Sequence, residues 1–237
     1  MRAVAREILV GMLTVCSGLA AAQPPKPAPD ASTMTKPEVS FQFERPGLSV
    51  PRYTLEIWED GTGRYQADQA EMPATANSSR GQAAQHIDRT INLSKDTVTK
   101  VFKAARAANY FNVDCASKAK NIANTGNKTL KYSGTDGSGT CTYNYSENKT
   151  VDSLTSTMIA IAYTIDEGRR FDFLHRYDRL GLDAEMISFA QEVDAGRALE
   201  LGTISPSLAA IVDDMAVIQR VRLKAQKMLE QVAAETH

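Results

Sequence analysis

The spacing of apolar residues changes once along this chain, at Gly168, and that change limits the folds open to it. Before Gly168, short segments carry an apolar residue at every second position, and two longer segments carry them at helical spacing. After Gly168 the spacing is helical only. Period two is typical of strands with one buried face, whereas steps of three and four residues are typical of amphipathic helices. We therefore predict an α+β domain at residues 39–168, followed by an all-helical C-terminal region at 169–237.

Hairpin turns between the predicted strands indicate a small antiparallel sheet. The strands are expected near residues 39–43, 53–57, 64–67, 87–93, 129–132 and 140–145. Asp60-Gly61 favours a tight turn between the second and third strands, and the glycine-rich segment 134–139 favours another between the last two. Two helices are expected to pack on the sheet: one follows the N-cap Ser94, and the other runs from Val151 to Gly168.

Three helices are predicted in the C-terminal region, at residues 171–180, 183–200 and 206–235, with Gly181 and Gly202 between them. Ser205 and Pro206 form an N-cap and first-turn pair for the last helix. Its apolar residues recur in steps of three and four: Leu208, Ile211, Met215, Ile218, Ala225, Leu229 and Val232. Such a seam packs either on the chain's own helices or on another chain, as a homodimer or with a helix of an envelope protein.

The first 22 residues have the three-part order of a secretory signal peptide. Arg2 and Arg6 give a positive start, residues 8–15 form a short apolar run, and the alanines at 20–22 permit cleavage before Gln23. The apolar run is too short to span a bilayer, and no later segment has the length and hydropathy of a transmembrane helix. We therefore expect a periplasmic or secreted protein.

Three further expectations are linked to export. Lipidation at Cys16 is the alternative for the N-terminus, because Cys16 follows an apolar stretch. Residues 23–38 contain five of the nine prolines and no aromatic residue, which favours a linker. Cleavage would leave Cys115 and Cys141 in the mature chain, and an even pair of cysteines in an oxidising compartment predicts one disulfide.

Composition and motifs exclude several classes of function. The chain has 27 Lys and Arg against 28 Asp and Glu, so no basic excess points to a nucleic-acid partner. It contains no G-x-S-x-G, P-loop, H-E-x-x-H or C-x-x-C motif. His86 and Asp88 share a strand face on which Asp88 could orient the imidazole, but no third metal ligand accompanies them. We therefore predict no catalytic, cofactor-binding or metal-binding residues.

One basic run stands out in the C-terminal half of the chain. It consists of Arg169, Arg170, Arg176 and Arg179. Asp172 lies four residues before Arg176, the favourable order for an ion pair on an exposed helix. A solvated helix face is one interpretation of this run, and a patch that binds an anion or a lipid headgroup is the other.

Three segments of the first region follow one another in a distinctive order. They are a strand with an Asp-Gly turn (YTLEIWEDGTGRY), a strand leading to a Ser-capped helix (INLSKDTVTKVFKAARAANYF) and, after a hairpin, a closing helix that ends in Ile-Asp (LTSTMIAIAYTID). In this order, the segment from about residue 52 to about residue 165 resembles a family of uncharacterised secreted bacterial α+β domains, which is classed as a domain of unknown function. The resemblance implies the fold and export, but no activity, and residues 169–237 lie outside it.

On these grounds we expect an exported bacterial protein that acts as a non-enzymatic binding or structural module of the cell envelope. The alternative is an envelope hydrolase that uses carboxylates such as Glu56, Glu59 or Asp60, for which no motif is present. The two functions differ in what a structure shows. An enzyme requires a concave pocket with converging titratable groups of perturbed pKa, whereas a binding module presents an exposed apolar patch or an open sheet edge.

Overall fold

The computed structural model describes residues 36–71 and 83–235. The expected signal peptide, the alternative lipidation at Cys16 and most of the linker at 23–38 lie outside the described residues, so they stay predictions. No helix within the described ranges is long and apolar enough to cross a membrane.

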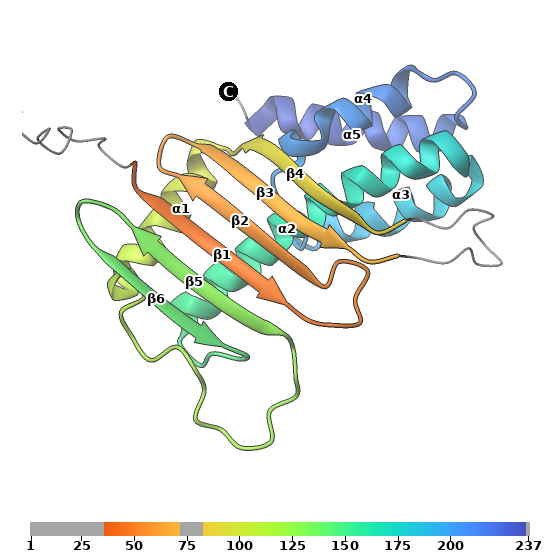
Figure 1. Cartoon of the computed structure of the whole chain (residues 1–237). Helices are drawn as coiled ribbons and strands as arrows, with labels where there is room; N and C mark the ends of the chain where they lie inside the picture. Colours follow the sequence, from red (N-terminus) through yellow and green to blue (C-terminus); the bar gives the residue numbers. More distant parts are fainter. Residues whose placement is uncertain (1–35, 72–82, 236–237) are drawn as a thin grey trace, which may run out of the picture. The chain divides into compact units, whose positions relative to one another are not determined.

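Six strands form one antiparallel sheet in the order β4-β3-β2-β1-β5-β6 (Figure 1). They are β1 (Glu38–Glu44), β2 (Arg52–Trp58), β3 (Thr62–Gln69), β4 (Gln85–Asn92), β5 (Asn127–Ser133) and β6 (Ser138–Tyr143). Strand β1 pairs with β2 on one side and β5 on the other, so it joins the first four strands to the last hairpin. The predicted antiparallel sheet and the α+β fold class are confirmed.

Two helices, α1 (Lys95–Ala107) and α2 (Lys149–Tyr177), cover one face of the sheet (Figure 1). Alternate strand residues such as Phe41 and Leu55 are fully buried beneath them. The hydroxyl of Ser94 accepts a hydrogen bond from the backbone N–H of Thr97 at 3.3 Å, as an N-cap does. The strands predicted from the period-two pattern and the helix predicted from its N-cap therefore form a two-layer arrangement of sheet and helices.

Helix α2 continues past Gly168, the residue at which the sequence pattern predicts its end. Gly168 is buried inside the helix, and a Cβ atom there would lie 2.3 Å from Cγ2 of Ile204. Glycine is therefore needed for the close approach of the segment at Ile204, and it does not end the helix. The predicted boundary at 168/169 falls inside one helix, and the division into two regions stays a prediction.

The C-terminal region is helical, as predicted, but its helices have other boundaries. They are α3 (Arg179–Asp194), α4 (Ser205–Asp213) and α5 (Gln219–Glu235), and the short 3-10 turn η2 (Leu201–Ile204) precedes α4. A second short 3-10 turn, η1 (Asn109–Phe111), lies earlier in the chain, after α1. Asp178, rather than Gly181, separates α2 from α3, because its Oδ1 accepts a hydrogen bond from the N–H of Gly181 at 3.0 Å. Ser205 is the first residue of α4, and its buried hydroxyl has no hydrogen-bond partner, so it is not the predicted N-cap.

The predicted helix at 206–235 is broken in two at Asp214. The Oδ1 of Asp214 accepts a hydrogen bond from the N–H of Ala216 at 2.8 Å, and the Asp214 carbonyl accepts one from the N–H of Val217 at 3.0 Å. This local turn competes with the helical hydrogen bonds and ends α4. Arg222 Nε donates to the carbonyl of Val212 at 2.8 Å, so the arginine that interrupts the seam caps the C-terminal end of α4.

This break prevents the continuous seam from forming. Leu208, Ile211, Leu229 and Val232 belong to, or pack against, a buried cluster built by the chain's own C-terminal helices. Met215 and Ile218 lie in the connection between α4 and α5, where they are 77% and 43% exposed. Association with a second copy through the C-terminal helix was one of the two alternatives for this seam, and solution measurements can test it.

We expect light scattering to give a monomeric mass both for the mature protein and for Ile218→Asp, because the apolar seam residues within α4 and α5 already pack inside the chain. Met215→Asp, at the neighbouring exposed position, should also leave the mass unchanged. A dimer that dissociates in Ile218→Asp would instead show that the connection between α4 and α5 pairs with a second copy.

Cys115 and Cys141 lie at disulfide distance, with their Sγ atoms 2.08 Å apart and their Cα atoms 5.9 Å apart. Cys141 is in the edge strand β6, and Cys115 is in the connection that follows η1. Both residues are buried. The pair therefore attaches this connection to the edge of the sheet, as predicted.

Buried apolar residues form two clusters. One lies between the sheet and the helices α1 and α2, and the other joins the end of α2 to the helices α3, α4 and α5. Glu200 provides a polar connection between the two parts. Its carboxylate accepts hydrogen bonds from the backbone N–H of Ser94 at 2.8 Å and from the Ser94 hydroxyl at 2.7 Å, next to the N-terminus of α1.

Candidate functional site

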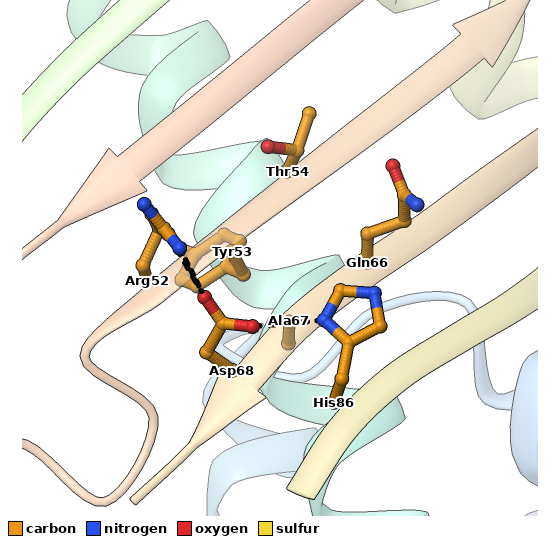
Figure 2. Close-up of a pocket in the computed structure, with 7 residues that line it drawn as sticks. All are labelled: Arg52, Tyr53, Thr54, Gln66, Ala67, Asp68 and His86. Atoms are coloured by element: carbon orange, nitrogen blue, oxygen red, sulfur yellow. Dashed lines mark hydrogen bonds and ion pairs between the residues drawn. The ribbon is translucent and has the colours of Figure 1, made fainter.

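Among the described residues, no helix lies over the sheet face opposite α1 and α2 (Figure 1). A hollow of about 250 Å³ opens on the sheet across β2, β3 and β4, and we name it the sheet-face hollow. It is lined by Arg52, Tyr53, Thr54, Gln66, Ala67, Asp68 and His86. Figure 2 shows Arg52, Asp68 and His86 in one row across three neighbouring strands, as the strand register requires.

Asp68 is the centre of this row. Its Oδ2 accepts from Nε and Nη2 of Arg52 at 2.9 and 2.6 Å, and its Oδ1 lies 2.8 Å from Nδ1 of His86. These contacts with His86 and Arg52 lower the pKa of Asp68. Asp88 does not orient His86, because it accepts instead from Nε of Arg64 at 2.8 Å. Side chains facing each other across two strands lie closer than side chains two residues apart along one strand, which explains the difference from the sequence expectation.

The row does not have the contacts of a hydrolytic site. The side chain of His86 is 62% exposed, and no hydroxyl or thiol of the described residues hydrogen-bonds to its ring. Nucleophilic catalysis requires a nucleophile within hydrogen-bond reach of its base. The row is an exposed network in which Asp68 pairs with Arg52 and contacts the ring of His86.

The three carboxylates of the hydrolase alternative do not converge. Glu56 is half-buried on the sheet face opposite α1 and α2, where burial raises its pKa. Glu59 pairs with Arg106 of α1 at 2.8 Å, and Asp60 accepts from the N–H of Thr62 at 3.0 Å to close the turn between β2 and β3. Within residues 36–71 and 83–235, no group of three or more His, Cys, Asp or Glu side chains is placed to hold a metal ion.

A larger hollow, of about 730 Å³, opens where β3 and β4 meet the C-terminal half of α2. It is lined by Gln69, Ala83, Ala84, Gln85, Arg89, Arg169, Asp172, Phe173, Arg176 and Tyr177, and we name it the arginine hollow. This lining contains three arginines and one aspartate. The arginine hollow therefore has a positive electrostatic character.

The basic run, which spans the end of α2 and the first residue of α3, is divided between the arginine hollow and the other helices. Arg169, Asp172 and Arg176 lie three and four residues apart, so they share the helix face that lines the hollow. The other two arginines pair with carboxylates elsewhere: Arg170 with Glu185 at 2.6 Å, and Arg179 with Asp214 at 3.0 Å. The four arginines do not form one patch.

Arg169 is held by hydrogen bonds at the inner wall of the arginine hollow. Its side chain is 14% exposed, and it donates to Oδ1 of Asp166 at 2.9 Å and to Oε1 of Gln69. The hydroxyl of Tyr65 donates to the other carboxylate oxygen of Asp166 at 2.8 Å. Burial raises the pKa of Asp166 despite these contacts. Arg169 therefore contributes charge to the hollow from a fixed position.

Arg89 reaches the arginine hollow from β4, and no sequence motif pointed to it. Its Nη2 lies 3.8 Å from Oδ2 of Asp172, which is an ion pair beyond hydrogen-bond distance. The expected pair of Asp172 with Arg176 does not form, because the guanidinium of Arg176 lies over the ring of Tyr177, 5.7 Å from its centroid. The sequence did contain one indication of this position. Arg89 lies midway between two isoleucines of β4 that face the helix layer, so its charged side chain points to the same side of the sheet.

Comparisons with known proteins identify no family for this chain. No protein-family model matches it, and no curated protein sequence matches it. The resemblance to secreted bacterial domains therefore stays a prediction, and the function has to be inferred from the two hollows.

Proposed function

We propose that this protein is an exported, non-enzymatic binding module of the bacterial cell envelope, and that its arginine hollow binds an anionic group. The observation that carries this proposal is the convergence of three guanidinium groups on a hollow that contains a single carboxylate. Guanidinium groups match the planar geometry of carboxylate and phosphate oxygens. The volume of about 730 Å³ lies within the usual range of small-molecule sites.

The positions of the acidic side chains favour binding over catalysis. Both carboxylate oxygens of Asp166, behind the hollow, are occupied by hydrogen bonds from Tyr65 and Arg169. The carboxylate that lines the hollow, Asp172, is 51% exposed and lies beside Arg89. A general acid or base has to reach its substrate in the protonation state that the reaction needs. Neither aspartate has such an arrangement.

Two observations support export. Residues 1–22 have the order of a signal peptide, and Cys115 and Cys141 lie at disulfide distance. Disulfides persist in oxidising compartments such as the periplasm and the extracellular space. A binding module for an envelope component would act in these compartments.

Titration with inorganic phosphate, followed by NMR of the arginine Nε–Hε groups in the mature protein, tests the proposal. We expect saturable shifts of the Arg89 and Arg176 signals. The double variant Arg89→Gln/Arg176→Gln should weaken phosphate binding by about tenfold or more, because it removes two charge-assisted contacts.

Arg179→Gln is the matched control for this experiment. It removes a cation from the same run, but one that pairs with Asp214 outside the hollow. It should therefore leave the phosphate affinity unchanged. Equal weakening in the control and in the double variant would indicate general charge attraction and would reject the arginine hollow as the site.

A further inference from the structure

We propose that the ligand of the arginine hollow is an amphiphile, with a phosphate or carboxylate headgroup and an alkyl or aryl chain. This inference rests on the proposed function and names its class of ligand. It follows from the two chemically different walls of the hollow, one cationic and one aromatic, which meet at a single residue.

Arg89 and Arg176 form the part of the cationic wall that a headgroup can reach. The side chain of Arg89 is 39% exposed, and its contact with Asp172 is 3.8 Å long, so its N–H donors remain available to a ligand. Arg176 is exposed and makes no ion pair with a described residue. Arg169 differs from both, because it already donates to two side chains at the inner wall. The two outer guanidinium groups are therefore the expected contacts of the oxyanion.

Phe173 and Tyr177 form the aromatic wall, one helical turn apart on α2. Their ring centroids are 5.1 Å apart with a tilt of 56°, and Tyr177 is 44% exposed. Ala83 and Ala84 add small apolar side chains to the lining. An apolar chain that lies on these rings would remove from water the surface they expose.

The two walls are contiguous, because Arg176 lies over the ring of Tyr177. A headgroup bound at Arg176 therefore places the attached chain next to the aromatic wall. A bare oxyanion would leave the rings in water, and an apolar ligand without a headgroup would leave the guanidinium groups unpaired. Asp172 opposes a highly charged ligand, so a headgroup with one or two negative charges fits better than a polyanion.

Calorimetric titration of the mature protein with butyl, hexyl and octyl phosphate tests this ligand class. Each added methylene that contacts the aromatic wall should increase the affinity by about fourfold, as burial of one methylene predicts. Arg176→Gln should weaken the binding of all three compounds by a similar factor. Tyr177→Ser should reduce the increase per methylene while it retains the binding of butyl phosphate.

The outcomes separate this inference from the proposed function. Equal affinity for butyl and octyl phosphate, with dependence on Arg89 and Arg176 retained, would overturn the amphiphile and leave the anion site in place. Binding that does not depend on Arg89 and Arg176 would overturn both the amphiphile and the anion site.

A second arm distinguishes a free amphiphile from a lipid headgroup in a bilayer. We expect the mature protein to stay unbound in flotation with phosphatidylglycerol vesicles, because the proposed ligand is a single-chain amphiphile that enters the hollow from solution. Flotation that Arg176→Gln abolishes, without binding of octyl phosphate, would overturn the inference in favour of a membrane surface.

Discussion

Replacing Glu167 by glutamine should flatten the dependence of stability on pH. Glu167 is 8% exposed on α2, and its Oε2 is buried without a hydrogen-bond partner. Its carboxyl shares a hydrogen bond with Glu185 of α3, which also pairs with Arg170 at 2.6 Å. Burial, and then the charge of Glu185, raise the pKa of Glu167 to about 8 from its usual 4.5. At neutral pH the folded protein therefore holds a proton that the unfolded chain has released.

The sign of the effect follows from this proton uptake on folding. Between about pH 4.5 and 8 the folded state binds more protons than the unfolded state, so the free energy of unfolding falls as the pH rises. The slope reaches about 1.4 kcal/mol per pH unit, or roughly 4 kcal/mol across the window. The stabilisation by protonated Glu167 is complete below pH 4.5 and is lost as the pH passes 8.

Urea unfolding of the wild type and of Glu167→Gln at pH 6 and pH 8.5 measures the difference. The variant should lose roughly 2 to 3 kcal/mol less than the wild type between these two values, because its amide cannot ionise. Glu192→Gln is the control, since Glu192 pairs with Arg197 on the surface and its pKa is lowered. Equal slopes for Glu167→Gln and the wild type would contradict the account.

Removal of the cysteine pair by Cys115→Ala/Cys141→Ala should lower the free energy of unfolding by about 3.5 kcal/mol. The two residues are 26 apart in the sequence, and closing a loop of that size restricts the unfolded chain by about this amount in the chain-entropy model. The measurement is urea unfolding of the oxidised wild type and of the double variant. A reducing agent should destabilise the wild type and leave the variant unchanged, whereas two titratable thiols in the denatured, unreduced wild type would show that the disulfide is absent.

The elements of the sheet layer could be predicted because their causes are local. In β1, Phe41 and its neighbours alternate between buried and exposed positions, and the hydroxyl of Ser94 caps α1 through a contact three residues away. The errors have causes that no local pattern contains. Gly168 lies inside a helix, and glycine is needed there because Ile204 packs against it. Asp214 ends α4 through its own side chain, in the middle of an apolar seam.

The candidate site could be predicted only in part, for a similar reason. Helical spacing placed Arg169 and Arg176 on one face, and an anion-binding patch was one of the two interpretations of that run. Arg89 could not be assigned to the same site, because only the strand order places β4 beside the C-terminal half of α2. The aromatic wall had no sequence signal either, since Phe173 and Tyr177 have the spacing of ordinary core residues.

The central claim, that the arginine hollow is the binding site, is tested most directly by a crystal structure of the mature protein grown with octyl phosphate. We expect the phosphate within hydrogen-bond distance of Arg89 and Arg176, with the alkyl chain along the rings of Phe173 and Tyr177. An octyl phosphate bound in the sheet-face hollow beside Arg52, or a structure at saturating ligand with none in the arginine hollow, would contradict the claim.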